Sequence, residues 1–269
     1  MYTMGVDIGS ASSKIVVLED GLNVVTSQAV QSGTGTSGPK VVLEKTRNSL
    51  SEKGIFFSDI SRTIVTGYGR FNFQLADKQL SEITCHAKGI HFLIPQARTI
   101  LDIGGQDAKA ISIDEGGYVQ QFFMNDKCAA GTGRFLDVMS KILEIPLNEM
   151  GKYDCLADKP VEISSTCTVF AESEVISQLS KGISRANIIA GVHNSTAHKV
   201  AGLLYRAGLK REVVMCGGVS KNTGVVRAIN DELGIEIIVA NNPQTTGALG
   251  AALFAYEEAQ KMRKEVIND

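Results

Sequence analysis

Two stretches of the sequence decide the fold: VDIGSASSKIVVL at residues 6–18 and LDIGGQDAKAISI at residues 101–113. A single shift superimposes them without a gap. The matched pairs are Asp7 and Asp102, Ile8 and Ile103, Gly9 and Gly104, Lys14 and Lys109, and Gly21 and Gly116. In each copy an apolar strand enters a tight Asp-x-Gly turn, and a second apolar strand ends in an acidic turn closed by glycine. A repeat of this kind favours a duplicated subdomain over a coincidence between two hairpins.

Helices and strands alternate through the rest of the chain. We expect strands at residues 24–30, 63–65, 212–216 and 236–239. We expect helices at residues 39–53, 75–92, 187–207 and 246–264. Pro39 stands in the first turn of one helix, and Gly208 stops another. The mixture predicts an α/β fold in which an antiparallel hairpin leads each half.

The composition narrows the class of protein. The 269 residues carry a formal charge of −2 and are 43% hydrophobic, which favours a well-packed core over disorder. No block of like charge is present, so nucleic acid and anionic membranes are poor candidates for the main partner. The longest apolar runs fall far short of the ~20 residues that span a bilayer. The first residues also lack a charged segment and a cleavage site, so we expect a soluble cytoplasmic protein.

The Asp-x-Gly turns suit phosphate binding. Gly9 and Gly104 allow the backbone close to a ligand, and the amides that follow can form an anion-binding concavity. A carboxylate beside a phosphate needs a cation between them, so Asp7 and Asp102 suggest Mg²⁺ held through water. A third glycine turn, Gly217-Gly218, follows a strand and precedes a helix, where a flat or phosphorylated ligand can approach.

The order of these turns resembles the first phosphate loop, second phosphate loop and adenosine loop of the actin, heat-shock-protein-70 and sugar-kinase ATPase superfamily. This resemblance implies two ribonuclease-H-like subdomains with ATP in a cleft between them. We assign residues 1–97 and 246–269 to the first and residues 98–245 to the second. A final helix containing residues 248–252 would cross between them.

Roles within such a site follow from the turns. We expect Asp7 and Asp102 to organise Mg²⁺ and water, and Gln106 or Asp107 to orient the attacking water. Lys109 is expected to be only an exposed strand charge. The residues expected to bind ATP or ADP are Gly9, Ser10, Ala11, Ser12, Ser13, Lys14, Gly104, Gly105, Gly131, Thr132, Gly133, Gly217, Gly218, Val219, Pro243 and Gln244, the last two in an Asn242-Pro243-Gln244 turn.

A competing motif lies at residues 33–38, where GTGTSG fits the G-x-G-x-x-G pattern of dinucleotide-binding folds. Such a fold needs an acidic residue at the end of the following strand. Asp59 has about the right spacing, but it precedes the strand at residues 63–65. This disfavours a dinucleotide site.

Two of the five cysteines differ from the others. Cys128 and Cys167 have polar or glycine-rich neighbours, and each is expected at the N-terminus of a helix, where the helix dipole favours thiolate. For Cys167 a Ser/Thr cluster at residues 164–166 would supply the cap. Cys85 and Cys216 are expected to be small buried hydrophobic side chains, and Cys155 lies in a polar loop. An iron–sulfur cluster usually needs four thiolates, so two per chain would require a symmetric dimer.

Longer motifs carry a closer resemblance. Residues 125–135 (NDKCAAGTGRF) and 164–178 (SSTCTVFAESEVISQ) are similar to the signatures of the activator ATPases of (R)-2-hydroxyacyl-CoA dehydratases, relatives of the benzoyl-CoA reductase ATPase subunits. The similarity covers essentially the whole chain, including VTGYGR at residues 65–70 and DIGGQD at residues 102–107.

This resemblance implies a homodimer with one [4Fe–4S] cluster, ligated by Cys128 and Cys167 of each subunit. It implies reduced ferredoxin or flavodoxin as electron donor. It also implies ATP-driven transfer of one electron to a separate dehydratase, where the electron starts a radical elimination of water.

Sequence features distinguish this activator function from three other functions. A small-molecule kinase of the same fold would not need Cys128 and Cys167 at these positions. A non-enzymatic actin-like filament protein likewise needs no cysteines. A reductase-type relative works within a hetero-oligomer, whereas a compact chain that matches along its length fits the free-standing dimeric activator better.

Overall fold

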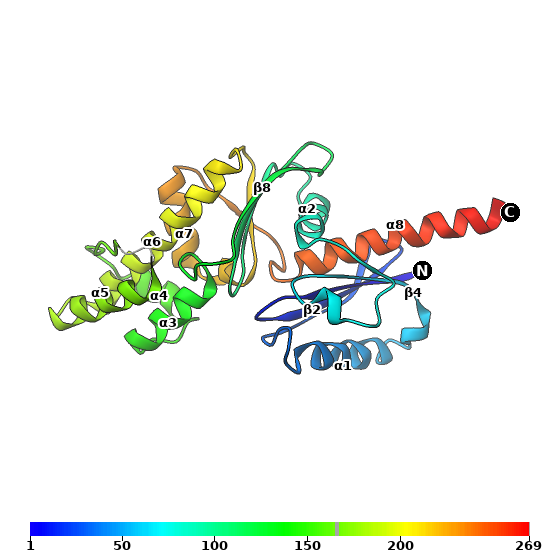
Figure 1. Cartoon of the computed structure of the whole chain (residues 1–269), viewed down its shortest axis with the longest axis horizontal. Coiled ribbons are helices and arrows are strands. Elements are labelled where there is room, and N and C mark those ends of the chain that lie inside the picture. The colour runs from blue at the N-terminus through cyan, green and yellow to red at the C-terminus, as the bar shows by residue number, and fades with distance from the viewer. Residues whose placement is uncertain (165–166, 269) are drawn as a thin grey trace. The chain divides into compact units, whose positions relative to one another are not determined.

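The computed structural model describes residues 1–164 and 167–268 and divides into two compact units (Figure 1). Unit 1 comprises residues 1–97 and 113–119 and the C-terminal segment from Gln244. Unit 2 comprises residues 98–112 and 120–243. Each unit has its own five-stranded sheet.

The sheet of unit 1 has the strand order β3-β2-β1-β4-β5. Its strands are β1 (Tyr2–Ile8), β2 (Ser13–Glu19), β3 (Asn23–Val30), β4 (Ile60–Thr66) and β5 (Lys78–Gln79). β1 pairs antiparallel with β2 and parallel with β4. The first three strands therefore form a meander, which a dinucleotide-binding βαβ unit does not contain.

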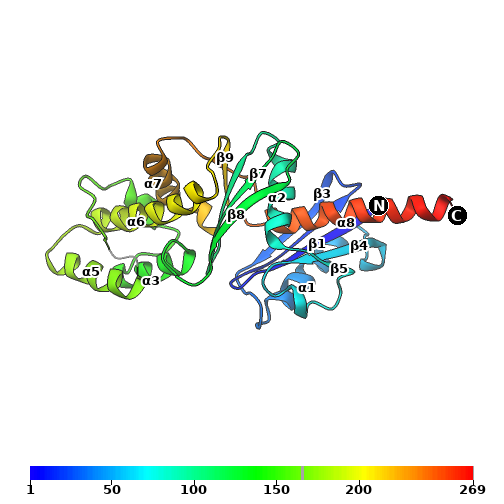
Figure 2. The same cartoon turned by 45° about the horizontal axis from the view of Figure 1, so that its top comes forward.

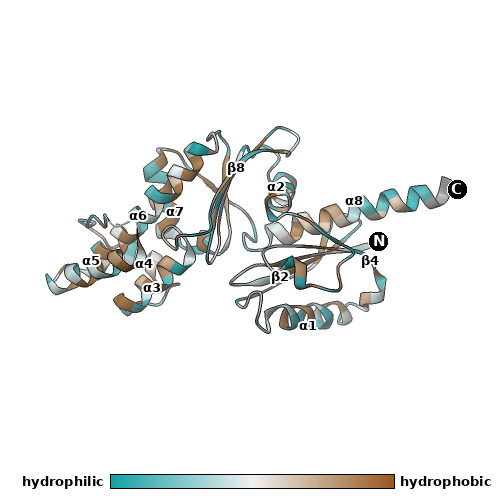
Figure 3. Cartoon of the chain, in the orientation of Figure 1, coloured by the Kyte–Doolittle hydropathy of each residue, from teal (hydrophilic) through white to brown (hydrophobic). Residues whose placement is uncertain are grey.

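Helices cover both faces of this sheet (Figure 2). Alternation along β2 divides its side chains: Ile15 and Val17 pack with α1 (Gly38–Ser51), whereas Val16 and Leu18 pack with α8 (Thr246–Asn268). α2 (Glu82–Leu93) packs on α8. Figure 3 shows α8 changing from apolar near its start to mostly hydrophilic toward its end, as expected for a helix whose first half is buried.

Unit 2 repeats the leading hairpin. Its sheet has the order β10-β9-β6-β7-β8, from β6 (Thr99–Ile103), β7 (Ala108–Ile113), β8 (Val119–Asn125), β9 (Val213–Cys216) and β10 (Ile238–Val239). β6 pairs antiparallel with β7 and parallel with β9. In this register Asp102 lies opposite Lys109, as Asp7 lies opposite Lys14 in the other unit. The predicted repeat is thus present as two hairpins with the same cross-strand pair.

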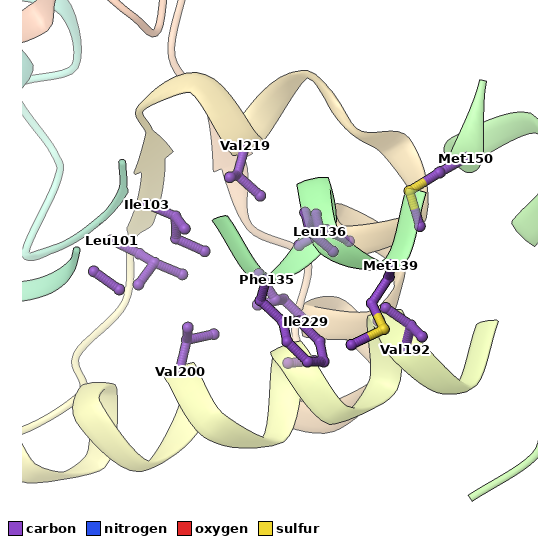
Figure 4. Close-up of a cluster of buried hydrophobic side chains, with 14 of the residues drawn as sticks. Leu101, Ile103, Phe135, Leu136, Met139, Met150, Val192, Val200, Val219 and Ile229 are labelled. Atoms are coloured by element: carbon purple, nitrogen blue, oxygen red, sulfur yellow. The ribbon is translucent and has the colours of Figure 1, made fainter. Parts of the chain in front are cut away.

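Among the described residues of unit 2, five α-helices follow the hairpin. They are α3 (Gly133–Leu143), α4 (Met150–Asp154), α5 (Thr168–Ser180), α6 (Arg185–Arg206) and α7 (Thr223–Leu233). Figure 4 shows Phe135, Leu136 and Met139 of α3 beside Val192 and Val200 of α6. These side chains belong to one buried cluster with Leu101 and Ile103 of β6. The core thus fixes the end of β6, where Asp102 stands, against α3.

The expected elements are largely confirmed, with one correction. The strands expected near residues 24, 63, 212 and 236 and three of the four expected helices are present with small shifts at their ends. The helix expected at residues 75–92 begins only at Glu82, because residues 78–79 form β5 beside β4. The helical spacing of apolar residues continues by chance through residues 75–81, although residues 78–79 pair with β4 at the edge of the sheet.

Candidate functional site

The first glycine turn of unit 1 lies between β1 and β2. The Gly9 amide donates to the Ser12 carbonyl at 2.9 Å and closes the turn. Asp7 is buried at the end of β1, and Lys14 Nζ lies 3.0 Å from its Oδ2. The cross-strand pairing therefore places a fixed ammonium group beside a carboxylate at the turn.

The serines of this turn differ in their surroundings. Ser10 and Ser12 are partly exposed, as is Ala11 between them. Ser13 is buried, and its hydroxyl donates to the Ser32 carbonyl at 2.8 Å. The structure thus gives Ser13 a partner within the protein, which makes it a support of the turn.

Two further segments contact this turn, and sequence reasoning did not place them there. Gly67 has φ +89°, and a Cβ at this position would lie 2.5 Å from Asp7 Oδ1. The Gly69 amide donates to the Ile8 carbonyl at 2.8 Å. The glycines of VTGYGR at residues 65–70 were the available signal, since two glycines separated by one residue mark a close backbone approach.

The second segment is the G-x-G-x-x-G stretch. The Thr34 amide donates to the Gly9 carbonyl at 2.9 Å, and Gly33 packs on the Ser10 carbonyl so closely that a Cβ would clash. These contacts build a loop that supports the first turn. The loop also lines a pocket of about 230 Å³ with Ile8, Gly69 and Phe73.

In unit 2 the corresponding turn runs from Gly104 to Asp107, closed by a 2.9 Å bond from the Gly104 amide to the Asp107 carbonyl. The sequence suggested that Lys109 is exposed, and this prediction is wrong: the residue is only 2% exposed. Its Nζ lies 3.2 Å from Asp102 Oδ2 and 2.7 Å from Asp107 Oδ2. A lysine in a strand is usually exposed, but here two carboxylates at the adjacent turn pair with its ammonium group and allow it to be buried. Gln106 is exposed, whereas the Asp107 carboxylate is bound to Lys109.

The start of α3 is attached to this second turn. The Gly133 amide donates to the Gly104 carbonyl at 2.9 Å, and the Arg134 amide donates to the Gly105 carbonyl at 2.7 Å. Gly131, Thr132 and Gly133 are all buried. The Thr132 hydroxyl donates to the Ala129 carbonyl at 2.7 Å. This segment therefore supports the turn from within unit 2.

The third glycine turn follows β9. Gly217 has φ +86°, and a Cβ there would lie 2.6 Å from Asp102 Oδ1. Its amide donates to the Pro243 carbonyl at 2.8 Å. Gly218 is exposed, whereas Val219 belongs to the core. Glycine is required at position 217 both for its backbone conformation and for the approach to Asp102.

Gln244 begins the last segment of unit 1. Of the other residues predicted to bind nucleotide, each lies in or beside a glycine turn of its own unit.

All five cysteines lie in the described part of the chain, and none forms a disulfide. Cys167 is the exposed N-cap residue of α5, as predicted. Residues 165 and 166 of its expected Ser/Thr cap lie outside the described residues. Cys128 is half-buried and precedes α3 in a loop, so the prediction of a helix N-terminus is wrong there. The glycines after it extend the loop to Thr132 before the helix begins.

The other cysteines are poorer ligands. Burial raises the pKa of the Cys85 thiol to about 12, which keeps it protonated. Cys216 is buried at the end of β9, and its Sγ lies 3.6 Å from Asp102 Oδ1. Cys155 is exposed, and its Sγ donates to the Gly151 carbonyl at 3.4 Å. Cys128, Cys155 and Cys167 are the cysteines whose side chains are at least partly accessible. The two of them in the motifs at residues 125–135 and 164–178, Cys128 and Cys167, fit half of a four-thiolate iron–sulfur site.

The class of protein follows from a comparison with known families. The chain belongs to the BadF/BadG/BcrA/BcrD ATPase family, whose model matches residues 4–255. It is 64% identical over 261 residues to the activator of lactoyl-CoA dehydratase from Anaerotignum propionicum, covering 97% of this chain and all of that protein.

Solved structures agree with this membership. The activator of the 2-hydroxyisocaproyl-CoA dehydratase from Clostridium difficile with bound ADPNP is 55% identical, covers 98% of both chains and has a TM-score of 0.94. Component A of the (R)-2-hydroxyglutaryl-CoA dehydratase of Acidaminococcus fermentans is 49% identical, covers 97% of this chain and 99% of its own, and has a TM-score of 0.92. The predicted actin-like α/β ATPase fold is thereby confirmed. Among the described residues, no helix is long and apolar enough to cross a membrane.

Proposed function

We propose that this chain is the activator ATPase of an (R)-2-hydroxyacyl-CoA dehydratase and couples ATP hydrolysis to the delivery of one electron. Three relatives with this kind of name cover the chain almost completely at 51–64% identity, which supports the dehydratase as partner. We further propose that residues 1–97 with 246–269 and residues 98–245 act as its two subdomains.

The nucleotide roles rest on the three turns. Asp7 and Asp102 would hold Mg²⁺ through water, each with one oxygen already oriented by a lysine. The exposed Gln106 is a better candidate than the lysine-bound Asp107 for orienting the attacking water. Gly217 and Gly218 would approach the nucleoside. Hydrogen-bond donors fixed before the reaction stabilise developing phosphate charge without reorganisation.

We propose that Cys128 and Cys167 of two chains hold one [4Fe–4S] cluster in a homodimer. When bound, the cluster would accept and donate a single electron at low potential, supplied by reduced ferredoxin or flavodoxin. The Cys128 and Cys167 thiolates would hold it, and the N-terminus of α5 would stabilise negative charge at Cys167.

One observation carries the coupling of the two activities. The amides of Gly133 and Arg134 bind the carbonyls of Gly104 and Gly105, and Cys128 lies only a few residues before them in the loop that leads into α3. A displacement of the phosphate turn by nucleotide would therefore be transmitted to the backbone that holds Cys128.

The test is anaerobic purification followed by a visible spectrum and measurement of iron and sulfide. A brown dimer with about four irons, bleached by a low-potential reductant, is expected. Cys167→Ser should lose iron and electron transfer to the dehydratase yet keep ATP binding. A colourless wild type that still binds ATP after attempted reconstitution would instead favour a small-molecule kinase.

A further inference from the structure

We infer that Asn125 is a positioning residue for Cys128, fixing the peptide groups on both sides of this cysteine so that its thiolate is presented in one orientation. The inference rests on the proposed function, since it assigns to Asn125 the task of holding a cluster ligand.

Asn125 is the last residue of β8 and is half-buried. Its side-chain Oδ1 accepts a hydrogen bond from the Cys128 amide at 3.2 Å. Its Nδ2 donates to the Cys128 carbonyl at 2.8 Å and to the Ala130 carbonyl at 3.0 Å. One carboxamide thus binds both main-chain polar groups of Cys128 and links the loop to the end of a sheet strand.

Only a carboxamide of this length supplies that pattern. Aspartate keeps the acceptor but loses both donors and turns a charged oxygen toward two carbonyls. Alanine removes all three bonds. The contact also determines where the Cys128 amide hydrogen points: toward Asn125 Oδ1, not toward its own sulfur. Hydrogen bonds to cluster sulfurs are among the factors that set the potential of an iron–sulfur centre, so Asn125 would influence that property as well.

The neighbouring residues provide a matched control. Asp126 and Lys127 form an exposed ion pair at 3.0 Å, and both lie within the same loop. In the described part of the chain the Lys127 side chain pairs with Asp126, and the described hydrogen bonds of the Cys128 peptide groups go to Asn125. Asp126→Asn should therefore change the local charge without releasing the loop.

The experiment compares wild type, Asn125→Ala, Asn125→Asp and Asp126→Asn as full-length protein purified without oxygen. Three readouts are taken: iron and sulfide per dimer, the electron paramagnetic resonance spectrum of the reduced cluster, and the rate of iron loss to a ferrous chelator. Iron loss should be at least fivefold faster in Asn125→Ala, because fivefold is about the factor for the loss of one net hydrogen bond and alanine removes three. Both Asn125 variants should alter the spectrum, and Asp126→Asn should match wild type in all three readouts.

The outcomes separate the two levels of the hypothesis. A wild type that binds no iron overturns the proposed function and this inference with it. An iron-loaded wild type whose Asn125 variants retain its spectrum and its rate of iron loss overturns the role of Asn125 alone. ATP binding and circular dichroism verify that each variant is folded. If Asn125→Ala does not fold, Asn125→Asp decides the question, because it keeps the size and the acceptor of the native side chain.

Discussion

At the scale of single residues, the repeated Asp–Lys pair is the most informative feature of the molecule. In both units the lysine faces the aspartate across a hairpin and is largely shielded from water. In unit 2 a second carboxylate, that of Asp107, shares the same ammonium group. Buried charges require such partners, because an unpaired one would lose its hydration without compensation.

Replacing Lys109 by methionine tests this view. The substitution leaves Asp102 and Asp107 facing each other without their shared cation, so we expect a loss of about 3 kcal/mol in the free energy of unfolding. Urea denaturation monitored by circular dichroism measures it. Lys127→Met removes a fully surface ion pair and should change stability by less than ~0.5 kcal/mol. Equal effects of the two substitutions would contradict the buried network.

At the scale of elements, close helix packing depends on particular glycines. Gly250 of α8 lies against the Cys85 carbonyl of α2, and an added Cβ would overlap it. Gly250→Ala should therefore separate the two helices and destabilise the protein by about 2 kcal/mol. Gly202 of α6 is also helical but has no neighbouring atom where a Cβ would stand, so Gly202→Ala should stabilise by about 0.5–1 kcal/mol. Thermal unfolding of both variants measures the contrast, and shifts of the same sign would refute it.

A buried polar network joins three helices of unit 2. Asp154 of α4 accepts from His193 of α6 at 2.8 Å, and Arg227 of α7 donates to both of its carboxylate oxygens. Burial opposes ionisation of Asp154, but the hydrogen bonds from His193 and Arg227 outweigh it and lower the pKa of this carboxyl. His193 in turn contacts the side chain of Asn222, which caps α7.

The lowered pKa predicts a pH dependence. The ionised Asp154 carboxylate contributes its full stabilisation above the ordinary aspartate pKa. This stabilisation is lost as the pH falls through the lower pKa that Asp154 has in the folded state. We therefore expect Asp154→Asn to be destabilised by about 3 kcal/mol at pH 7. The difference from wild type should shrink below about pH 4. Chemical denaturation at a series of pH values measures this, and a difference that does not vary with pH would show that the charge of Asp154 is unimportant.

At the scale of the whole molecule, two activities are proposed to share one chain, and they should separate genetically. Asp102→Asn should reduce ATP turnover about 100-fold while the iron content stays at the wild-type level. Cys167→Ser should remove iron while ATP binding is retained. Parallel assays of ATP turnover and iron content measure both. Unchanged ATP turnover in Asp102→Asn would exclude its proposed role.

Local sequence patterns alone specify the duplicated hairpin, the α/β class and the positions of the three glycine turns. These depend on local patterns: apolar alternation gives strands, and glycine after aspartate gives a tight turn. The placement of Cys167 at the start of α5 was likewise local, because it follows from the apolar periodicity of the helix and from the polar residues before it.

Other features depend on contacts between residues distant in sequence and become visible once the chain is folded. The burial of Lys109, the contact of Gly67 with Asp7 and the recruitment of residues 78–79 into a sheet edge all arise when segments far apart along the chain pack together. The loop around Cys128 is set the same way, by attachment of Gly133 and Arg134 to a turn formed some 30 residues earlier. Hydrogen bonds between distant backbone groups leave no periodic signal in the sequence, which is why local patterns predicted Cys128 at a helix N-terminus where the fold places it in a loop.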